Sequence, residues 1–253
     1  MENSLGFIGG GRITNIFLQA FNNKNISLKN ICVFDTNKKV SKKLKQKFPE
    51  ISISDLKTAV SQEIVFIALH PPAIMETLAT IKEFLNKNSI IISLAPKITI
   101  KKISQTLGNK NIVRLIPNAT SVINEAYNPV CFAPEIEQKP ELMKILLILG
   151  KTFETEEHKL EAYAMMSAML PTYFWFQWYE MIEIAQQMGL SETESFETVE
   201  ETLISSLNTM FKSGLNQQQV IDLIPVKPIG EHENEIREIY RDKLIALFNK
   251  IKS

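Results

Sequence analysis

The chain has 253 residues, of which 45% are apolar and 22% charged, with 28 basic and 28 acidic side chains. A chain of this size folds without disulfide or metal crosslinks, and its composition is typical of a globular protein of one or two domains. The net charge of zero gives no overall attraction for nucleic acids or acidic membranes. No apolar run approaches the roughly 20 residues of a membrane span, and residues 1–11 lack the pattern of a secretory signal. Two cysteines form neither a disulfide framework nor a zinc motif, so we expect a cytoplasmic protein.

The two parts of the chain differ in charge and in periodicity. Residues 1–150 carry 19 basic and 11 acidic side chains, whereas residues 151–253 carry 9 and 17. Short apolar runs alternate with helical patterns in the first part, and only helical patterns follow from about residue 156. We therefore predict two domains, a nucleotide-binding domain over residues 1–154 and a helical domain over residues 155–253.

The first elements surround a cluster of glycines. Of only nine glycines, four lie at positions 6, 9, 10 and 11, directly after a short apolar strand over residues 5–8. Apolar residues at helical spacing follow from Ile13 to Phe21, and a second strand over residues 29–35 ends in Asp35. Strand, glycine-rich turn, helix, strand and carboxylate form the dinucleotide-binding pattern, in which the diphosphate approaches the helix N-terminus and the acid accepts a ribose hydroxyl. Thr14 replaces the third glycine, and a surface turn that binds no nucleotide is the alternative.

The remaining elements of the first part predict a Rossmann-type, doubly wound, mostly parallel sheet. Continuous apolar strands separated by helices are typical of a parallel sheet that is covered on both faces. Ligands of such folds lie beyond the carboxyl ends of the strands. The strands are predicted at residues 51–54, 63–69, 89–95, 111–116 and 130–133, and the helices at residues 73–85 and 100–107. Gly108, Gly150, Gly189 and Gly214 each follow a helical pattern and are predicted to end a helix.

The second part is predicted to be all helical, with helices at residues 156–169, 171–188, 192–212, 217–224 and 231–252. Ser191 and Glu194 have the spacing of a capping box. The stripe of Met and aromatic residues between Met165 and Met181 is broader than one helix face can bury. An ordinary domain core explains it, but we favour a homodimer interface, because a helix that is apolar all round must be covered on every side.

The motifs resemble, in order along nearly the whole chain, those of the pyrroline-5-carboxylate reductase family. GFIGGGRIT at residues 6–14 is similar to the family's glycine-rich opening, FIALHPP at 66–72 to F-L-A-V-K-P-Q, and IISLAPKI at 91–98 to I-S-I-A-A-G-I. RLIPNAT at 114–120 resembles R-x-M-P-N-T-P, SAMLPTY at 167–173 falls where the family has S-G-S-G-P-A-Y, and VKPIGE at 226–231 where it has T-S-P-G-G-T.

This resemblance implies an NAD(P)H-dependent oxidoreductase with a Rossmann domain and an all-α C-terminal dimerisation domain. Such enzymes transfer hydride from the nicotinamide to the C=N bond of a small cyclic imine, as in the last step of proline biosynthesis. The cofactor-binding residues are then expected to be Gly9, Gly10, Gly11, Arg12, Ile13, Asp35, Thr36, Leu69, His70, Pro71, Ala95 and Asn118. The substrate-binding residues are expected to be Met169, Pro171, Thr172, Lys227, Gly230 and Glu231.

The departures from the family concentrate in the two substrate loops. Ala168, Met169 and Leu170 replace Gly, Ser and Gly, while Lys227 and Ile229 replace Ser and Gly, and Glu231 replaces the Thr expected near the imine. Lost glycines remove the close backbone approach that an anion needs, and a carboxylate repels an anionic substrate. His70, which replaces the family's Lys, could donate a proton to the imine, or it could be an ordinary loop residue. His70, Lys227 and Glu231 are thus the predicted catalytic residues.

The choice of cofactor remains open. Asp35 favours NADH, because a carboxylate accepts a ribose hydroxyl and repels a 2′-phosphate, but Lys38, Lys39, Lys42 and Lys43 could hold that phosphate. His232 has no second ligand at helical spacing, so we expect no metal site. Three functions stay possible: an imine reductase, a dinucleotide-binding paralogue without catalysis, and a reductase acting on another imine or a ketone. In each case we expect small-molecule ligands rather than nucleic acid or membrane partners.

Overall fold

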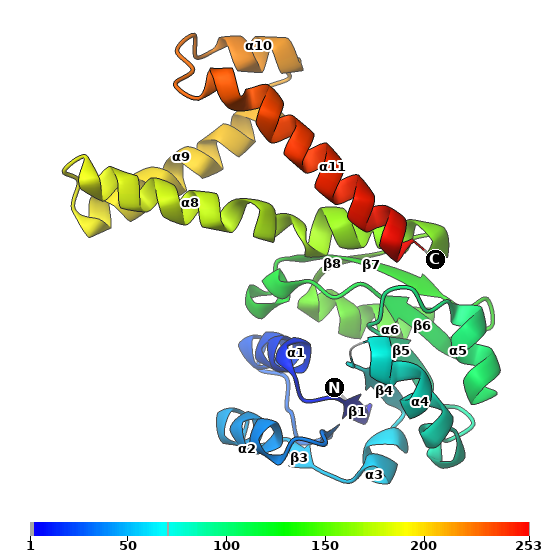
Figure 1. The fold of residues 1–253 in the computed structure, drawn as a ribbon. Coiled ribbons are helices and arrows are strands. Elements are labelled where there is room, and N and C mark those ends of the chain that lie inside the picture. Colours follow the sequence, from blue (N-terminus) through cyan, green and yellow to red (C-terminus); the bar gives the residue numbers. More distant parts are fainter. Residues whose placement is uncertain (1–2, 70, 253) are drawn as a thin grey trace. The chain divides into compact units, whose positions relative to one another are not determined.

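The computed structural model describes residues 3–69 and 71–252, without the side chains of residues 71 and 72. It contains two compact units, one that comprises the chain up to Met169 together with its last residues from Phe248, and one formed by Leu170–Leu247 (Figure 1).

The first unit is built on one eight-stranded sheet with the order β3-β2-β1-β4-β5-β6-β7-β8. Strands β1 to β6 run parallel where they pair, β7 is antiparallel to β6, and β8 is parallel to β7. The predicted Rossmann-type, mostly parallel sheet is thereby confirmed. The strands are β1 (Leu5–Ile8), β2 (Ile31–Phe34), β3 (Ser52–Ile53), β4 (Ile64–Ile67), β5 (Ile90–Ser93), β6 (Ile112–Leu115), β7 (Ala126–Phe132) and β8 (Gly150–Glu154).

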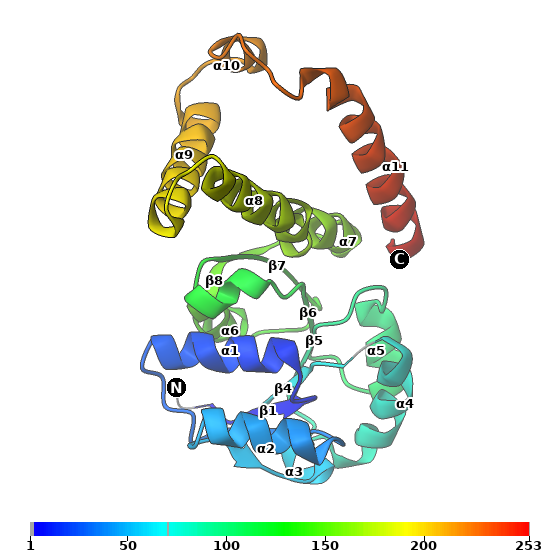
Figure 2. The same ribbon diagram turned by 60° about the vertical axis from the view of Figure 1, so that its left-hand side comes forward.

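Helices cover both faces of this sheet. Helix α1 (Arg12–Asn23) packs against the 3₁₀ turns η2 (Ala119–Ile123) and η3 (Leu147–Leu149), whereas α4 (Pro71–Ile81) packs against α3 (Leu56–Val60) and α5 (Ile100–Leu107). Figure 2 shows α4 and α5 on the other side of the strands from α1. Phe7 of β1 and Phe66 of β4 stack in the core with ring centroids 4.6 Å apart. The remaining helices of this unit are α2 (Lys38–Lys47), the turn η1 (Lys82–Phe84) and α6 (Lys139–Leu146).

Two strand expectations differ from the structure at the antiparallel end of the sheet. Strand β7 begins four residues before the predicted 130–133, and β8 was not predicted at all. Gly150 directly follows the helical turn η3 and ends it, as expected, and with φ 135° it is also the first residue of β8. A Cβ there would collide with the backbone of Ala126, the residue it pairs with, so glycine is required at this helix end for close strand approach as well.

The segment after β8 still packs on the sheet. It forms the turn η4 (Glu157–Lys159), α7 (Leu160–Tyr163) and a π-helical turn η5 (Ala164–Ala168) in place of the single predicted helix. Leu160 and Ala164 are buried against Ile116 and Cys131 of the sheet layer. The compact unit therefore extends to Met169, while a division into domains after residue 154 stays a prediction.

The second unit consists of helices, as predicted. They are α8 (Leu170–Gln187), α9 (Glu192–Lys212), α10 (Gln217–Asp222), the turn η6 (Gly230–His232) and α11 (Glu233–Ile251), whose last residues belong to the first unit. The capping box is present, because the Ser191 hydroxyl accepts from the N–H of Glu194 and the Glu194 carboxylate accepts from the N–H of Ser191. No helix among the described residues is long and apolar enough to cross a membrane.

Candidate functional site

The glycine turn leaves the N-terminus of α1 open. Gly11 is the N-cap of α1 and provides no side-chain hydrogen bond, and a Cβ added at Gly11 would meet nothing within 4 Å. Gly9 has φ 104°, and a Cβ there would collide with the carbonyl oxygen of Ala68 on the neighbouring strand end. The first N–H groups of the helix and its positive dipole end therefore face free space, which is the arrangement that binds a diphosphate.

The side chains of Thr14 and Asp35 hold this turn by hydrogen bonds to its backbone. Thr14, at the place where the pattern expects a third glycine, is fully buried and donates its hydroxyl to the carbonyl of Gly9 at 2.5 Å. The Asp35 carboxylate accepts from the N–H of Gly10 at 2.8 Å and from the N–H of Asn37 at 2.6 Å. The departure at Thr14 thus fits the turn, and Asp35 is held at the carboxyl end of β2 beside it.

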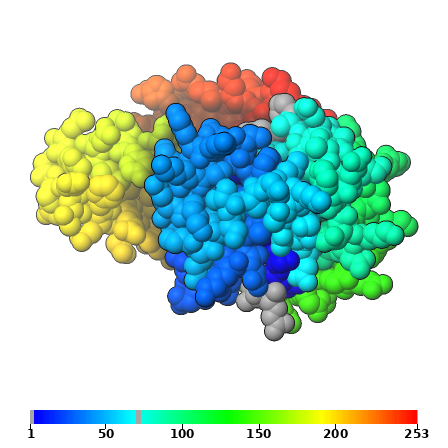
Figure 3. All heavy atoms as spheres, turned by 90° about the horizontal axis from the view of Figure 1, so that it is seen from below, coloured from blue at the N-terminus to red at the C-terminus, as the bar shows by residue number. Residues whose placement is uncertain are grey.

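A cavity of about 310 Å³ adjoins the turn. Four of the predicted cofactor residues line it, namely Gly9, Asp35, Thr36 and Leu69. In the space-filling view, the blue surface of the segment around α2 adjoins the cyan surface of the segment around α3 and α4 (Figure 3). Sequence reasoning missed the other wall, because nothing in a helix pattern tells which face will border a cleft. It is formed by Ile8, Phe34, Leu56, Ala73, Glu76, Thr77 and Thr80.

Two of the residues predicted on the nicotinamide side, Ala95 and Asn118, are buried in the first unit. Ala95 follows β5 and is 1% exposed. Asn118 is 4% exposed, and its amide binds within the protein: its Nδ2 donates to the carbonyl of Ser167 at 3.0 Å, and its Oδ1 accepts from the N–H and the hydroxyl of Thr120. Asn118 therefore holds the π-helical turn η5, an irregularity that is frequent at functional sites. Its expected cofactor contact is left as a prediction.

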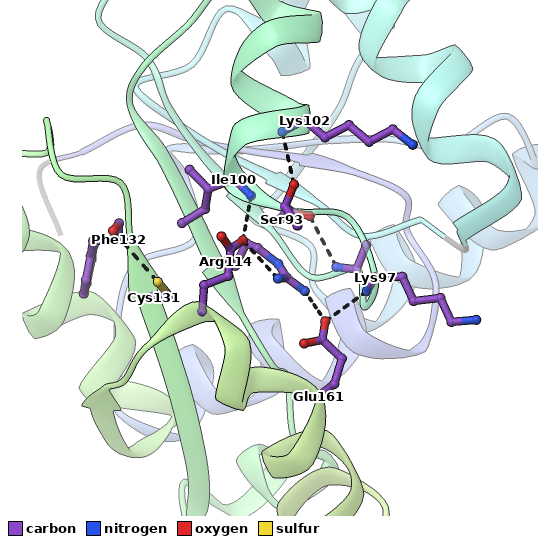
Figure 4. Close-up of polar contacts among 11 residues, drawn as sticks. Ser93, Lys97, Ile100, Lys102, Arg114, Cys131, Phe132 and Glu161 are labelled. Carbon is purple, nitrogen blue, oxygen red and sulfur yellow. Dashed lines mark hydrogen bonds and ion pairs between the residues drawn. The ribbon is translucent and has the colours of Figure 1, made fainter. Parts of the chain in front are cut away.

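A buried ion cluster that the sequence analysis did not predict lies near the carboxyl end of β5. Arg114 of β6 is fully buried and donates to Glu161 at 2.6 Å and to Glu157 at 3.0 Å (Figure 4). Glu161 also accepts from the N–H of Lys97 at 3.1 Å, and Glu157 from the N–H of Ile100 at 2.6 Å. The three side chains thereby join β6, the turn after β5, the turn η4 and α7. The sequence signal that could have indicated this cluster is Arg114 itself, because a charged residue within an apolar strand needs a buried partner.

The predicted substrate residues are distributed over both units. Met169 follows η5 in the first unit, whereas Pro171 and Thr172 begin α8 in the second. Within the second unit, Lys227 and Gly230 line a groove of about 600 Å³, and Thr172 lines a different one of about 490 Å³. Glu231 is exposed, with Oε1 3.6 Å from Nε2 of His232. The second unit alone therefore does not bring these residues into one cavity.

The other candidate residues give no site of their own. His70 lies outside the described residues, as does the side chain of Pro71. No group of His, Cys, Asp and Glu in the described part of the chain could hold a metal ion. Cys32 and Cys131 are free thiols, and burial raises the pKa of both, which favours the protonated thiol.

Comparisons with known proteins agree with this geometry. Residues 4–97 match the family model described as NADP oxidoreductase, coenzyme F420-dependent. The pyrroline-5-carboxylate reductase of Corynebacterium melassecola is 23% identical over 97% of this chain and 93% of its own length. The crystal structure of Plasmodium falciparum pyrroline carboxylate reductase with NADP bound superposes with a TM-score of 0.85 and 23% identity, covering 99% of this chain and 97% of that one. The reductase of Streptococcus pyogenes gives a TM-score of 0.76 at 16% identity, covering 98% and 96%. The predicted resemblance to this family and the predicted fold are confirmed.

Proposed function

We propose that this chain, a divergent relative of the pyrroline-5-carboxylate reductases, is an NAD(P)H-dependent reductase of a small cyclic imine. The observation that carries the proposal is the open N-terminus of α1 at Gly11, because it provides a diphosphate site in a chain that aligns with such reductases over nearly its whole length. The bound cofactor would supply the hydride, and the protein would hold the imine in position next to the nicotinamide.

In this proposal the protein contributes mainly alignment. The N–H groups of Arg12 and Ile13 would hold the diphosphate, and Asp35 would accept a hydroxyl of the adenosine ribose. The hydride must reach the carbon of a C=N bond, and a protonated imine is electrophilic enough that correct placement provides most of the acceleration. His70, Lys227 and Glu231 are proposed to supply or hold that proton, with Met169, Pro171, Thr172 and Gly230 shaping the substrate pocket.

For the cofactor we favour NADH over NADPH. The Asp35 carboxylate is fixed at the strand end by the N–H of Gly10, where it would lie beside the ribose and oppose a 2′-phosphate. Lys38 and Lys42 line a neighbouring groove of about 570 Å³ that also includes Asp35, so a phosphate on that side would find cations. Titrating both cofactors into wild-type protein and Asp35→Asn decides this: NADH specificity predicts that the variant loses affinity for NADH and gains affinity for NADPH.

We further propose a homodimer through the C-terminal helices. The buried apolar side chains of the described residues include only Ile182 between Leu170 and Leu247, while Phe176, Met188 and Phe211 are 68%, 80% and 73% exposed. Trp175, Trp178 and Phe196 line a groove of about 480 Å³ between α8 and α9. A unit with so little core of its own needs another surface to cover its apolar faces, and a second copy of the chain supplies one.

The second candidate function is a paralogue that binds a dinucleotide without catalysis. It is favoured by the loss of the family's substrate-loop glycines and by the separate grooves of Thr172 and Lys227 within the second unit. A reductase of another imine or of a ketone is a variant of the first proposal, and a ketone would require an acid–base residue such as His70 or Lys227.

The test combines cofactor binding with turnover. Calorimetric titration of NADH and NADPH is paired with oxidation of each cofactor in the presence of pyrroline-5-carboxylate. We expect binding and turnover in wild type, and at least about 10-fold weaker binding in Gly11→Ala with unchanged thermal stability, because its Cβ occupies only ligand space. Gly9→Ala is the contrasting variant, since it should lose stability as well. Binding without turnover on any imine would favour the paralogue, and no binding of either cofactor would refute both functions.

A further inference from the structure

The turn after β5 contains a lysine in a conformation that glycine normally adopts. Pro96 and Lys97 form the turn, and Lys97 has φ 69°. This left-handed region disfavours residues with a Cβ, and glycine or asparagine is the usual second central residue of a turn that has proline first. The similar reductases have the Gly of I-S-I-A-A-G-I at this place. Lys97 is therefore retained at a cost in backbone strain.

The buried ion cluster holds Lys97 in this conformation. The N–H of Lys97 donates to Glu161, whose side chain is 1% exposed and is fixed by Arg114 at 2.6 Å (Figure 4). Three residues further on, the N–H of Ile100 donates to Glu157, which also binds Arg114. The N–H of Lys97 and the first N–H of α5 are thus both held by carboxylates that bind one buried guanidinium. Strain that the surroundings fix in this way is concentrated at functional sites.

The position of Lys97 suits an anion on the nicotinamide side. It lies at the carboxyl end of β5, next to β4 and two strands from β1, whose end carries the glycine turn. Two strand spacings are about 10 Å, so the backbone of Lys97 lies about that far along the sheet edge from the end of β1. Its side chain is exposed and runs away from Glu161 (Figure 4), and within the described ranges no carboxylate forms an ion pair with it.

We propose that Lys97 is a specificity-determining residue that binds the carboxylate of the imine substrate. This inference rests on the proposed reductase function. An ammonium group on a flexible stem can bind a carboxylate without the close backbone approach that is lost where Ala168 replaces the family's glycine. Arg114 and Glu161 act through Lys97 and are positioning residues.

The test compares stability with specificity in Lys97→Gly. Because glycine relieves the left-handed strain, we expect the Tm to stay the same or rise by about 2–4 °C. At the same time kcat/KM for pyrroline-5-carboxylate should fall at least about 10-fold, because a charge-assisted contact is lost. Reduction of 1-pyrroline, the same ring without the carboxylate, should change by less than about twofold. Lys97→Arg should retain most activity, and Lys101→Ala, an exposed lysine on the next helix, should change neither quantity.

Binding of L-proline to the protein in the presence of NAD⁺ provides a readout that needs no turnover. Calorimetry should show binding to wild type and at least about 10-fold weaker binding to Lys97→Gly. If wild type reduces neither imine but this difference is found, the reductase proposal is wrong and the role of Lys97 in binding a carboxylate holds. The role of Lys97 is refuted if wild type binds no proline or if Lys97→Gly binds proline as tightly as wild type does. It is also refuted if Lys97→Gly lowers the kcat/KM for pyrroline-5-carboxylate and for 1-pyrroline by the same factor.

Discussion

The buried cluster of Arg114, Glu157 and Glu161 allows a quantitative prediction. Glu161→Gln keeps the size of the side chain and an oxygen acceptor for the N–H of Lys97, but it removes the charge that faces Arg114 at 2.6 Å. Removal of one member of a buried ion pair costs about 3–5 kcal/mol, because the remaining charge is left in a poorly solvated place. Arg114 keeps Glu157, whose side chain is 29% exposed, so we expect the lower end of this range, about 3 kcal/mol.

Thermal unfolding of the full chain measures this effect. For a chain of this size, 1 kcal/mol corresponds to about 2–4 °C in Tm, so Glu161→Gln should lower the Tm by about 6–12 °C. Glu157→Gln is the matched control: the same chemical change at a partly solvated partner should cost no more than about 1 kcal/mol, or 2–4 °C.

A double-mutant cycle separates the ion pair from general damage. Arg114→Met and Glu161→Gln should each be strongly destabilising, and the double variant should be more stable than the sum of the single effects predicts by about 1–3 kcal/mol. The reasoning is refuted if Glu161→Gln is as mild as Glu157→Gln, or if the two effects in the cycle add without coupling.

Four further predictions follow from particular contacts. Thr14→Val removes the hydroxyl that holds the carbonyl of Gly9 and should cost about 1 kcal/mol in urea unfolding while weakening cofactor binding several-fold; unchanged binding would show that the turn needs no such anchor. Gly150→Ala should lower the Tm strongly, because its Cβ meets the backbone of Ala126, whereas Gly214→Ala, with open space around it, should have the smaller effect. Phe176→Asp and Phe211→Asp should shift light-scattering mass from dimer to monomer, and an unchanged dimer would place the interface elsewhere. Hydrogen bonds from the hydroxyl and N–H of Ser191 lower the pKa of Glu194 from its ordinary 4.5. The ionised carboxylate therefore stabilises the fold above that pH, and this stabilisation is lost as the pH falls through the lower pKa of the folded state. In urea titrations the stability difference between wild type and Glu194→Gln should shrink in acid, and a difference that stays constant with pH would contradict this prediction.

Local patterns in the sequence were sufficient for most of the first unit. The run Leu5–Ile8, the four neighbouring glycines, the helix from Arg12 and the carboxylate at Asp35 are all encoded within about thirty residues, because a strand, a turn and a helix N-terminus are local structures. The parallel sheet also follows from sequence, since apolar strands alternating with helices have few other ways to bury both faces. The four predicted residues around the cavity beside the turn are adjacent for this reason.

Contacts between residues far apart in the chain were decided only by the tertiary structure. Arg114 meets Glu157 and Glu161 across more than forty residues, and Asn118 meets Ser167 across forty-nine; neither spacing leaves a periodic signal. Gly150 has the same local context as a helix-ending glycine, and only its pairing with Ala126 in β8 shows that it permits close strand approach. The sequence thus determined the nucleotide-binding turn and the class of fold, because these depend on neighbouring residues. The tertiary structure decided which buried charges hold Lys97 and which apolar faces of the C-terminal helices stay uncovered, because burial is a property of the assembled chain.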